Sequence, residues 1–308
     1  PFPVWYCKSC GRPVFAAPEQ LPVNPLETPY TGTCVCGCTE FLPETAVFDT
    51  WATSSLTPLI NAQNGLPALP MTMRTQAHEI IRTWTFYTIV RSLYHTGKLP
   101  WKELMICGFV LAKPGEKMGK SKGNALDPAA LIEKHSADAL RYWTAGAKLG
   151  TDTLFSEKEL DGAKRFLTKL WNAAKFVFAR LSDYAPDGAA PILPADRWIL
   201  ARCAEAAEKA AALLRVYEPG PARREIDALF WHDFCDDYLE LVKDRLYKPE
   251  IYGEAARRSA QAALYGAFLC ILKLYAIYVP HITEHLYGLY FRQFESALSI
   301  HRLRWDAP

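Results

Sequence analysis

The segment ELMICGFVLAKPGEKMGKSKGNALDP, residues 103–128, places an apolar run directly before a lysine-rich loop. Its first ten residues form a continuous apolar run of the length expected for a buried parallel strand. A loop follows in which three lysines fall within six residues, between Gly115 and Gly123. Open α/β sheets bind their ligands at the carboxyl ends of their strands, so a strand followed by this loop predicts a ligand-binding edge.

The loop has the composition of a polyphosphate-binding site. Lysines are compact cations on flexible stems, and glycines allow backbone N–H groups to approach an anion closely. Asp127 and Pro128 predict the start of a helix, as an N-cap acid followed by a proline at the first helical position. The lysines would then face the positive end of the helix dipole. The alternative interpretation is a solvated basic turn.

This loop resembles the KMSKS signature of class I aminoacyl-tRNA synthetases, with Lys117, Met118, Lys120 and Ser121 in register and Gly119 in place of the usual serine. Three further segments flank it: DTWATSS at 49–55, QAHEIIRTW at 76–84 and ADALRYW at 137–143. Their order and spacing resemble those of valyl-tRNA synthetases of the archaeal type. The resemblance covers residues 1 to about 294.

The resemblance implies an α/β plus all-α architecture. Residues 48–155 would be the C-terminal half of a Rossmann-like catalytic domain, preceded by a zinc-knuckle segment at 1–47 and followed by a helical anticodon-binding domain at 156–308. The HIGH-type nucleotide motif and the editing domain of the family precede the matching region and are not found in these residues. We therefore expect the C-terminal portion of a larger enzyme, or a truncated paralogue, that is inactive alone.

The resemblance also implies a function, the ligation of valine to tRNA(Val) through an aminoacyl-adenylate, with ATP and Mg²⁺ as substrate. Lys117 and Lys120 would be catalytic. ATP would also contact Met118, Ser121, His78 and Glu79, and valine would contact Asp49, Trp51, Ile80 and Trp84. Two alternatives stay open, a noncatalytic tRNA-binding paralogue and an isoleucine or leucine enzyme of the same subclass.

Aromatic spacing supports an amino-acid pocket. Residues 76–95 carry apolar side chains at helical spacing, and Trp84 lies one turn beyond Ile80. Together with Trp51 they are expected to converge on one small apolar cavity. Tryptophans at such spacing are more often core residues, and His78 taken alone would more often be a core or surface histidine.

Cysteines fall into two groups. Cys7, Cys10, Cys34, Cys36 and Cys38 crowd near the N-terminus, whereas Cys107, Cys203, Cys235 and Cys270 are scattered, as small core residues are. The pattern C-x-x-C-G at 7–11 is a zinc-knuckle turn, and the 34–38 segment offers a second pair. The sequence predicts a structural zinc site of Cys7, Cys10, Cys34 and Cys36, with Cys38 as the alternative to Cys34. A disulfide cluster and vestigial cysteines are the other possibilities.

From residue 156 onward the pattern predicts a bundle of four or five amphipathic helices joined by short loops. Ser156 and Glu159 match a capping box. An apolar stripe follows at Leu160, Ala163, Leu167, Leu170, Ala174, Val177 and Leu181. Proline and Asp-Gly residues predict a loop at 184–194, and further helices are expected at 196–217, 221–247 and 254–278.

Residues 230–240, FWHDFCDDYLE, resemble a segment of class Ia anticodon-binding domains. We interpret it as a core helix, with Ile226, Leu229, Phe230, Phe234, Tyr238 and Leu241 facing inward. RNA contact would require basic side chains on an exposed face together with aromatic side chains. The candidates are Arg223, Arg224, Lys243, Arg245 and Lys248, each of which could equally be a solvated charge.

Composition fits a globular protein. Half of the 308 residues are apolar and the net charge is +2, so any contact with nucleic acid must come from local basic faces. No apolar run reaches the roughly 18 residues of a membrane span, and the first residues match no signal region. We expect a monomeric cytoplasmic protein that binds no membrane.

Overall fold

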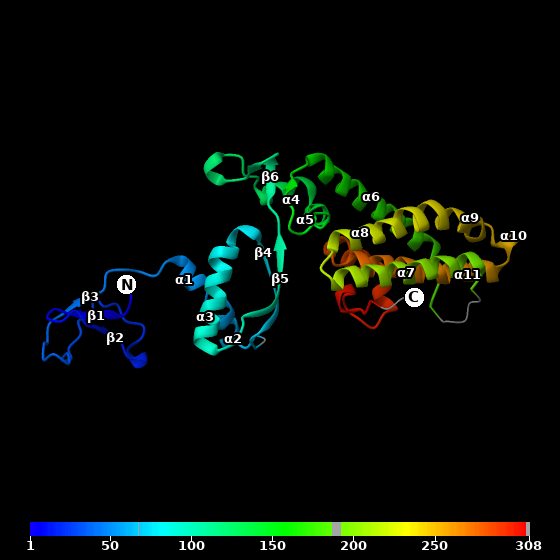
Figure 1. Ribbon diagram of the computed structural model, residues 1–308. Coiled ribbons are helices and arrows are strands. Elements are labelled where there is room, and N and C mark those ends of the chain that lie inside the picture. The colour runs from blue at the N-terminus through cyan, green and yellow to red at the C-terminus, as the bar shows by residue number, and fades with distance from the viewer. Residues whose placement is uncertain (67, 187–191, 306–308) are drawn as a thin grey trace. The chain divides into compact units, whose positions relative to one another are not determined.

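The structure is a computed structural model that describes residues 1–66, 68–186 and 192–305. The chain divides into two compact units, residues 1–106 and 107–308, whose elements are labelled in Figure 1. The predicted domain limits at residues 47 and 155 stay predictions. Within the described ranges, no helix combines the length and the apolar character needed to cross a membrane.

The first unit begins with a three-stranded sheet of order β2-β1-β3. Its strands are β1 (Val4–Cys7), β2 (Pro13–Phe15) and β3 (Phe41–Pro43), and both pairings are antiparallel. Trp5, which is 2% exposed, anchors the sheet, and its indole N–H donates to the backbone oxygen of Thr28 at 3.0 Å.

An α/β segment completes the first unit. Its elements are α1 (Thr50–Ser54), α2 (Thr57–Gln63), β4 (Met71–Ala77), α3 (Phe86–Thr96) and β5 (Trp101–Cys107). Strands β4 and β5 form one sheet, and the N–H of Met71 donates to the oxygen of Pro100 at 2.9 Å. The two strands thus begin side by side with a helix between them, as in a βαβ unit.

The helix predicted from residue 76 begins two residues later. Gln76 and Ala77 still belong to β4, and a 3₁₀ turn (His78–Ile80) and a π-helical turn (Ile81–Thr85) precede α3. The Gln76 side chain is buried and accepts a hydrogen bond from the Thr85 hydroxyl at 2.6 Å. Tertiary pairing of β4 overrides the helical periodicity at this position.

The continuous strand predicted at 103–112 is wrong. The chain forms β5, bends, and then forms β6 (Val110–Lys113) in a different sheet, of order β7-β6-β8. A Cβ at Gly108 would lie 2.0 Å from the backbone oxygen of Thr151, and the Phe109 N–H donates to Asp152 at 2.8 Å. Close approach of the distant 151–152 segment therefore bends the chain. The run is also only partly buried among the described residues.

Strands β7 (Glu116–Lys117) and β8 (Thr153–Leu154) flank β6, antiparallel and parallel respectively. Helices α4 (Pro128–His135) and α5 (Ala137–Thr144) follow the loop. The predicted N-cap of α4 is confirmed, because the Asp127 carboxylate accepts from the Ala129 N–H at 3.0 Å.

Ser136, which joins α4 to α5, has φ 81° and ψ 155°, a region that is populated almost only by glycine. Its side chain caps α5 by accepting from the Ala139 N–H at 3.3 Å. We expect Ser136→Gly to raise the free energy of unfolding by about 1 kcal/mol. The relief of backbone strain exceeds the loss of the side-chain cap, which costs only a few tenths of a kcal/mol when glycine replaces serine. Urea denaturation measures the change.

Ser156 is the matched control for that prediction, since it caps α6 (Glu157–Arg180) from φ −136°, where serine is unstrained. Ser156→Gly should leave the stability unchanged or lower it slightly. A decrease of equal size in both variants would show that Ser136 is not strained.

The capping box at the start of α6 is only half formed. Ser156 accepts from the Glu159 N–H at 3.3 Å, but the Glu159 carboxylate accepts instead from the Trp143 indole at 2.7 Å. A tertiary donor on α5 thus binds the carboxylate that the local pattern assigned to the helix start. The predicted stripe of α6 is buried apart from Leu167, which is partly buried.

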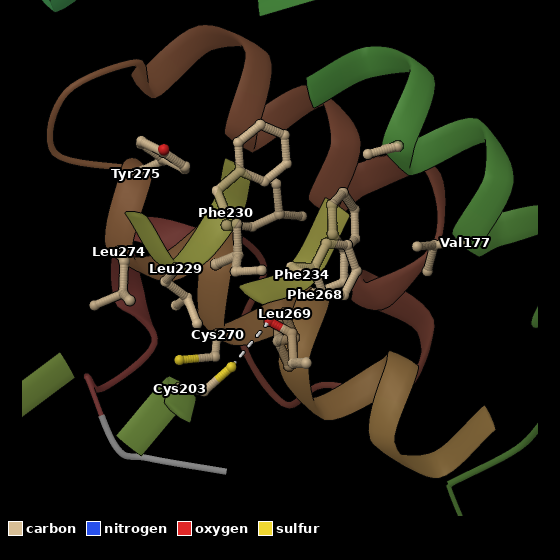
Figure 2. Close-up of a cluster of buried hydrophobic side chains, with 14 of the residues drawn as sticks. Val177, Cys203, Leu229, Phe230, Phe234, Phe268, Leu269, Cys270, Leu274 and Tyr275 are labelled. Atoms are coloured by element: carbon tan, nitrogen blue, oxygen red, sulfur yellow. Dashed lines mark hydrogen bonds between the residues drawn. The ribbon is translucent and has the colours of Figure 1, made fainter. Parts of the chain in front are cut away.

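A helical bundle forms the rest of the second unit and confirms the all-α prediction. Its helices, besides α6, are α7 (Pro194–Arg215), α8 (Pro219–Ala228), α9 (Leu239–Tyr247), α10 (Pro249–Tyr252), α11 (Glu254–Tyr275) and α12 (Pro280–Leu289). The loop predicted at 184–194 lies partly outside the described residues. Figure 2 shows the core, in which Phe230, Phe234 and Phe268 are fully buried.

A π-helical segment, Leu229–Tyr238, joins α8 to α9 without a break. Phe230, Phe234 and Tyr238 are fully buried, so the interpretation of this segment as a core helix is confirmed. Leu241, predicted to face inward, is 60% exposed, and Val242 is buried in its place. The wider π turns rotate the face that follows them, which a pattern of α-helical period does not anticipate.

Asp196 lies in the first turn of α7 and has no exposed surface. Arg245 donates to both of its carboxylate oxygens at 2.8 Å, Tyr238 donates at 2.8 Å, and Ser259 also donates to it. Arg245, a candidate for RNA contact, is therefore a structural residue, because a buried carboxylate requires an opposite charge.

Candidate functional site

The lysine loop is a compact turn between β6 and α4. Gly115 and Gly123 have φ of 74° and 66°, which glycine adopts without strain. The side chain of Asn124 spans the loop, since its oxygen accepts from the Gly119 N–H at 2.9 Å and its nitrogen donates to Glu116 at 2.7 Å. These two bonds join the middle of the loop to its two ends.

The predicted loop residues differ in exposure. Lys117 is exposed, and its ammonium lies 3.9 Å from the centre of the Phe109 ring, within the range of a cation–π contact. Met118 is half-buried and Ser121 exposed, while the side chain of Lys120 lies outside the described part of the chain. The Lys117 charge is thus positioned by an aromatic ring and accessible to an anion.

Gly119 is the position that departs from the signature. A Cβ there would meet only Ser121 Oγ at 3.9 Å and Lys122 Cγ at 4.0 Å, which are ordinary contacts. A serine side chain would therefore fit, and the loop's shape does not depend on the absence of a side chain at Gly119.

The predicted amino-acid residues lie in the first unit. Asp49 caps α1 by accepting from the Trp51 N–H at 3.2 Å, and both residues line a pocket of about 260 Å³ with Phe86, Tyr87, Val90 and Arg91. Trp51 is 41% exposed. The site at Asp49 and Trp51 is thus an open pocket with aromatic walls and two charged groups.

Trp84 and Ile80 do not line this pocket. Trp84 is 4% exposed, stacks on Trp101 at 5.3 Å and donates from its indole to Ser54 on α1 at 2.7 Å. Ile80 is half-buried, whereas His78 and Glu79 are exposed in the 3₁₀ turn. The predicted convergence of Trp51, Ile80 and Trp84 on one cavity is not seen here, because Trp84 packs into the core beside Trp101.

Four cysteines lie together between two knuckle turns. The sulfurs of Cys7, Cys10, Cys34 and Cys36 all lie within 4.8 Å of one another, and it is the one such cluster of potential ligands among the described residues. Gly11 and Gly37 close the two turns with φ of 69° and 85°. Each glycine N–H donates to the backbone oxygen of the first cysteine of its turn.

The donor set fits a tetrahedral metal ion. The Cys7–Cys36 and Cys10–Cys34 sulfur distances are both 3.6 Å, near the roughly 3.8 Å edge of a tetrahedron with Zn–S bonds of about 2.3 Å. All nine cysteines are free thiols. The N–H of Cys10 donates to the Cys7 sulfur, lowers the pKa of Cys7 and favours its thiolate.

Cys38 lies outside this cluster. Its sulfur accepts from the Glu40 N–H at 3.4 Å, and its backbone oxygen accepts from the Cys34 N–H at 2.9 Å. The geometry of the second turn thus selects Cys34 and Cys36 as the pair that meets Cys7 and Cys10.

A basic groove of about 1040 Å³ lies between the β8 segment, α5, α6 and α8. Lys148, Lys158 and Arg165 line it with exposed side chains. Trp231 also lines it, with Lys169 at 5.7 Å from its ring. Such a combination of cations and an aromatic face suits the backbone and bases of RNA.

The basic residues singled out from the sequence have other partners. Arg223 lies over the Tyr142 ring at 4.2 Å and 3.4 Å from Asp227, while Lys243 and Lys248 pair with acids on their own helix. Arg224 is exposed. Arg223 also lines the groove, whereas its other cations, Lys148, Lys158 and Arg165, were not among the candidates.

Two family descriptions match the chain. Residues 32–156 match the class I tRNA synthetases for isoleucine, leucine, methionine and valine, and residues 196–308 match the anticodon-binding domain of tRNA ligases. The chain belongs to the class I aminoacyl-tRNA synthetases. This confirms the resemblance that the lysine loop and its flanking segments indicated.

Curated valine–tRNA ligases are similar to this synthetase chain along nearly its whole length. The chain is 42% identical to the enzyme of Haloarcula marismortui and 41% identical to that of Methanopyrus kandleri, each over 99% of this chain. It is 40% identical to the enzyme of Anaplasma marginale over 94% of this chain. The chain spans about a third of the length of these relatives, 34–36%.

Solved synthetase structures share the fold. A ternary LeuRS–tRNA–LeuAMS complex from Agrobacterium radiobacter K84 superposes with a TM-score of 0.74 at 20% identity, over 99% of this chain and 40% of that one. Methionyl-tRNA synthetase of Mycobacterium tuberculosis, bound by methionyl-adenylate, superposes with a TM-score of 0.58 at 19% identity. The match covers 78% of this chain and 48% of that one. The predicted class I catalytic segment with a helical anticodon-binding domain is thus confirmed as the fold.

Proposed function

We propose that this chain acts in valine–tRNA ligation and supplies the phosphate-binding loop, part of the valine pocket and the tRNA-binding bundle. Identity of about 40% to valine–tRNA ligases over nearly the whole chain carries the proposal. In this reaction the valine carboxylate attacks the α-phosphorus of Mg²⁺-bound ATP and releases pyrophosphate. A terminal tRNA hydroxyl then attacks the carbonyl of the adenylate, takes the valyl group and releases AMP.

The loop's role follows from charge. Lys117 and Lys120 neutralise the β- and γ-phosphates as negative charge develops on the leaving pyrophosphate, because fixed cations stabilise that charge most in the transition state. The hydrogen bonds of Asn124 to Gly119 and Glu116 support this role by fixing the loop. Met118 and Ser121 complete the ATP contacts, and His78 and Glu79 meet the ribose or the adenylate.

Valine binds beside Trp51 in this proposal. An aromatic wall excludes larger side chains, and Asp49 offers a carboxylate to the substrate's ammonium. Trp84 supports the pocket from the core through its hydrogen bond to Ser54, on the helix that carries Trp51, and the contact of Ile80 with valine stays a prediction. The protein works in the cytoplasm as a monomer.

RNA binding tests the proposal on this chain alone. We expect tighter binding of a tRNA(Val) transcript than of a transcript with a swapped anticodon, at physiological salt, since phosphate contacts weaken steeply with ionic strength. Equal affinity for the two transcripts would contradict anticodon reading by the bundle.

Groove variants separate backbone contacts from anticodon reading. The double variant Lys158→Ala, Arg165→Ala should weaken the binding of both transcripts equally. It should also reduce the slope of log affinity against log salt concentration by about 1 for each cation removed. Lys175→Ala is the control, because Lys175 is exposed on the same helix and does not line the groove. Equal losses from the control and the groove variants would remove the groove from the proposal.

The cysteine cluster holds a structural zinc ion in this proposal. We expect about one zinc per chain by elemental analysis, lost in Cys34→Ser and retained in Cys38→Ser, whose sulfur lies outside the cluster. Metal loss should abolish amide-exchange protection in residues 1–47, because binding of a structural zinc supplies roughly 10–16 kcal/mol of folding free energy.

The bundle provides the internal reference for this experiment. The amide protection of the bundle should be unchanged when a chelator removes the zinc or when Cys34 is replaced by serine, since the bundle has its own core. Equal zinc content in the Cys34 and Cys38 variants would refute the ligand set.

A further inference from the structure

A second pocket, of about 620 Å³, lies along α12 and gathers three of the chain's seven histidines. It is lined by His281, His285 and His301, with Glu284 and Arg292 between them. None of the family's residues considered above belongs to it. A pocket with three imidazoles has the donor chemistry of a transition-metal site.

Two of the histidines lie four residues apart on one helix. His281 and His285 belong to α12 (Pro280–Leu289), so they lie one above the other on the same face. The His285 ring stacks on Trp171 of α6 at 5.8 Å, with 16° between the planes. The indole thereby restricts the orientation of this imidazole and leaves its edge, which carries the nitrogens, available.

The third histidine is fixed beside α12 by Glu284. The Glu284 carboxylate accepts from the Ser299 hydroxyl at 2.9 Å and from the Ile300 N–H at 3.0 Å. The Ser299 hydroxyl oxygen in turn accepts from the His301 N–H at 3.3 Å. These bonds attach the 3₁₀ turn Ile300–Arg302 to the helix between His281 and His285.

The charges around the pocket allow a cation. Arg292 is the other charged group of the lining, and it donates to Glu284 at 2.9 Å, so its charge is compensated. Glu284 itself is occupied on both oxygens, by Arg292 on one and by Ser299 and Ile300 on the other. Glu284 therefore orients the site, and the three imidazoles remain as its donors.

We propose that His281, His285 and His301 bind a divalent transition-metal ion, such as Zn²⁺, Ni²⁺ or Cu²⁺, through their imidazole nitrogens. All three side chains are exposed, and binding requires His281 and His301 to rotate about their side-chain bonds toward an ion held at His285. Unlike the four thiols, they are not preassembled within 4.8 Å in the described chain. The bound ion joins the turn at 300–302 to α12 and fastens the end of the described chain to the bundle.

Nickel titration tests the site in protein whose cysteine cluster has first been saturated with zinc. We expect calorimetry to give one Ni²⁺ per chain, unaffected by excess Mg²⁺, because imidazole prefers nickel and magnesium prefers oxygen ligands. His281→Ala with His285→Ala should abolish binding. His301→Ala should weaken it by at least about tenfold, the loss that even an outer partner of a metal produces.

His232→Ala is the matched control, since His232 is 75% exposed on its helix and lies outside the pocket. It should bind nickel as the parent chain does. The melting temperature of every variant without nickel shows whether it is folded. Saturating nickel should raise the melting temperature of the parent and of His232→Ala fully, that of His301→Ala less, and that of the His281 and His285 double variant not at all.

Two results would overturn the proposal. Nickel affinity unchanged in the His281 and His285 double variant would place the ion elsewhere. Affinity unchanged in His301→Ala would exclude the site of three imidazoles and the link to the 300–302 turn.

Discussion

Lys117→Ala is expected to lower the rate of valine activation by about a hundredfold to a thousandfold, the loss found when one donor to transition-state charge is removed. Valine affinity should change little, because Lys117 acts on charge that develops only in the transition state. ATP–pyrophosphate exchange, measured in a valine-activating assembly that contains this chain, gives both quantities. An unchanged rate would refute the role of Lys117.

Lys113→Ala is the control for the loss of one nearby positive charge. Lys113 is a lysine of the same hairpin, opposite Glu116 in the β6–β7 pairing, and does not belong to the loop. Its removal should leave the exchange rate close to that of the parent. Equal losses from Lys113 and Lys117 would indicate a diffuse electrostatic effect and not a positioned contact.

Asp196→Ala is expected to lower the free energy of unfolding of the bundle by about 3–5 kcal/mol, the cost of breaking a buried ion pair. The guanidinium of Arg245, 13% exposed at its side chain, would lose both of its carboxylate bonds. Tyr238 and Ser259 would lose an acceptor as well. Urea denaturation followed by circular dichroism measures the loss.

Two comparisons sharpen this prediction. Asp244→Ala removes the partner of Lys248 from an exposed pair on one helix, and it should cost far less because water solvates both groups. Asp196→Ala combined with Arg245→Met should recover part of the loss, since no unpaired charge stays buried. A double variant no more stable than Asp196→Ala would contradict this explanation.

Local signals predicted the parts of this protein that depend on neighbours in the chain. The N-cap at Asp127 and the knuckle turns at Gly11 and Gly37 involve residues within a few positions of one another. The stripe of α6 and the buried face at Phe230 and Phe234 follow from helical period, because one apolar face suffices to build a bundle. The lysine loop was recognisable by composition because its lysines and glycines are neighbours in the chain.

Contacts between distant residues decided the rest. The strand predicted at 103–112 breaks at Gly108 because the 151–152 segment packs against it, and Glu159 bonds Trp143 and not its own helix start. Arg245, one of several similar cations in the sequence, becomes buried only because Asp196 lies beside it.

The family, the order of the elements, the lysine loop and the first cysteine pair followed from the sequence, because each depends on residue types at short spacings. Tertiary structure alone selected Cys34 over Cys38 and Val242 over Leu241, and brought the three histidines into one pocket. These outcomes depend on the path of the backbone between distant residues, which a pattern of neighbouring residues does not specify.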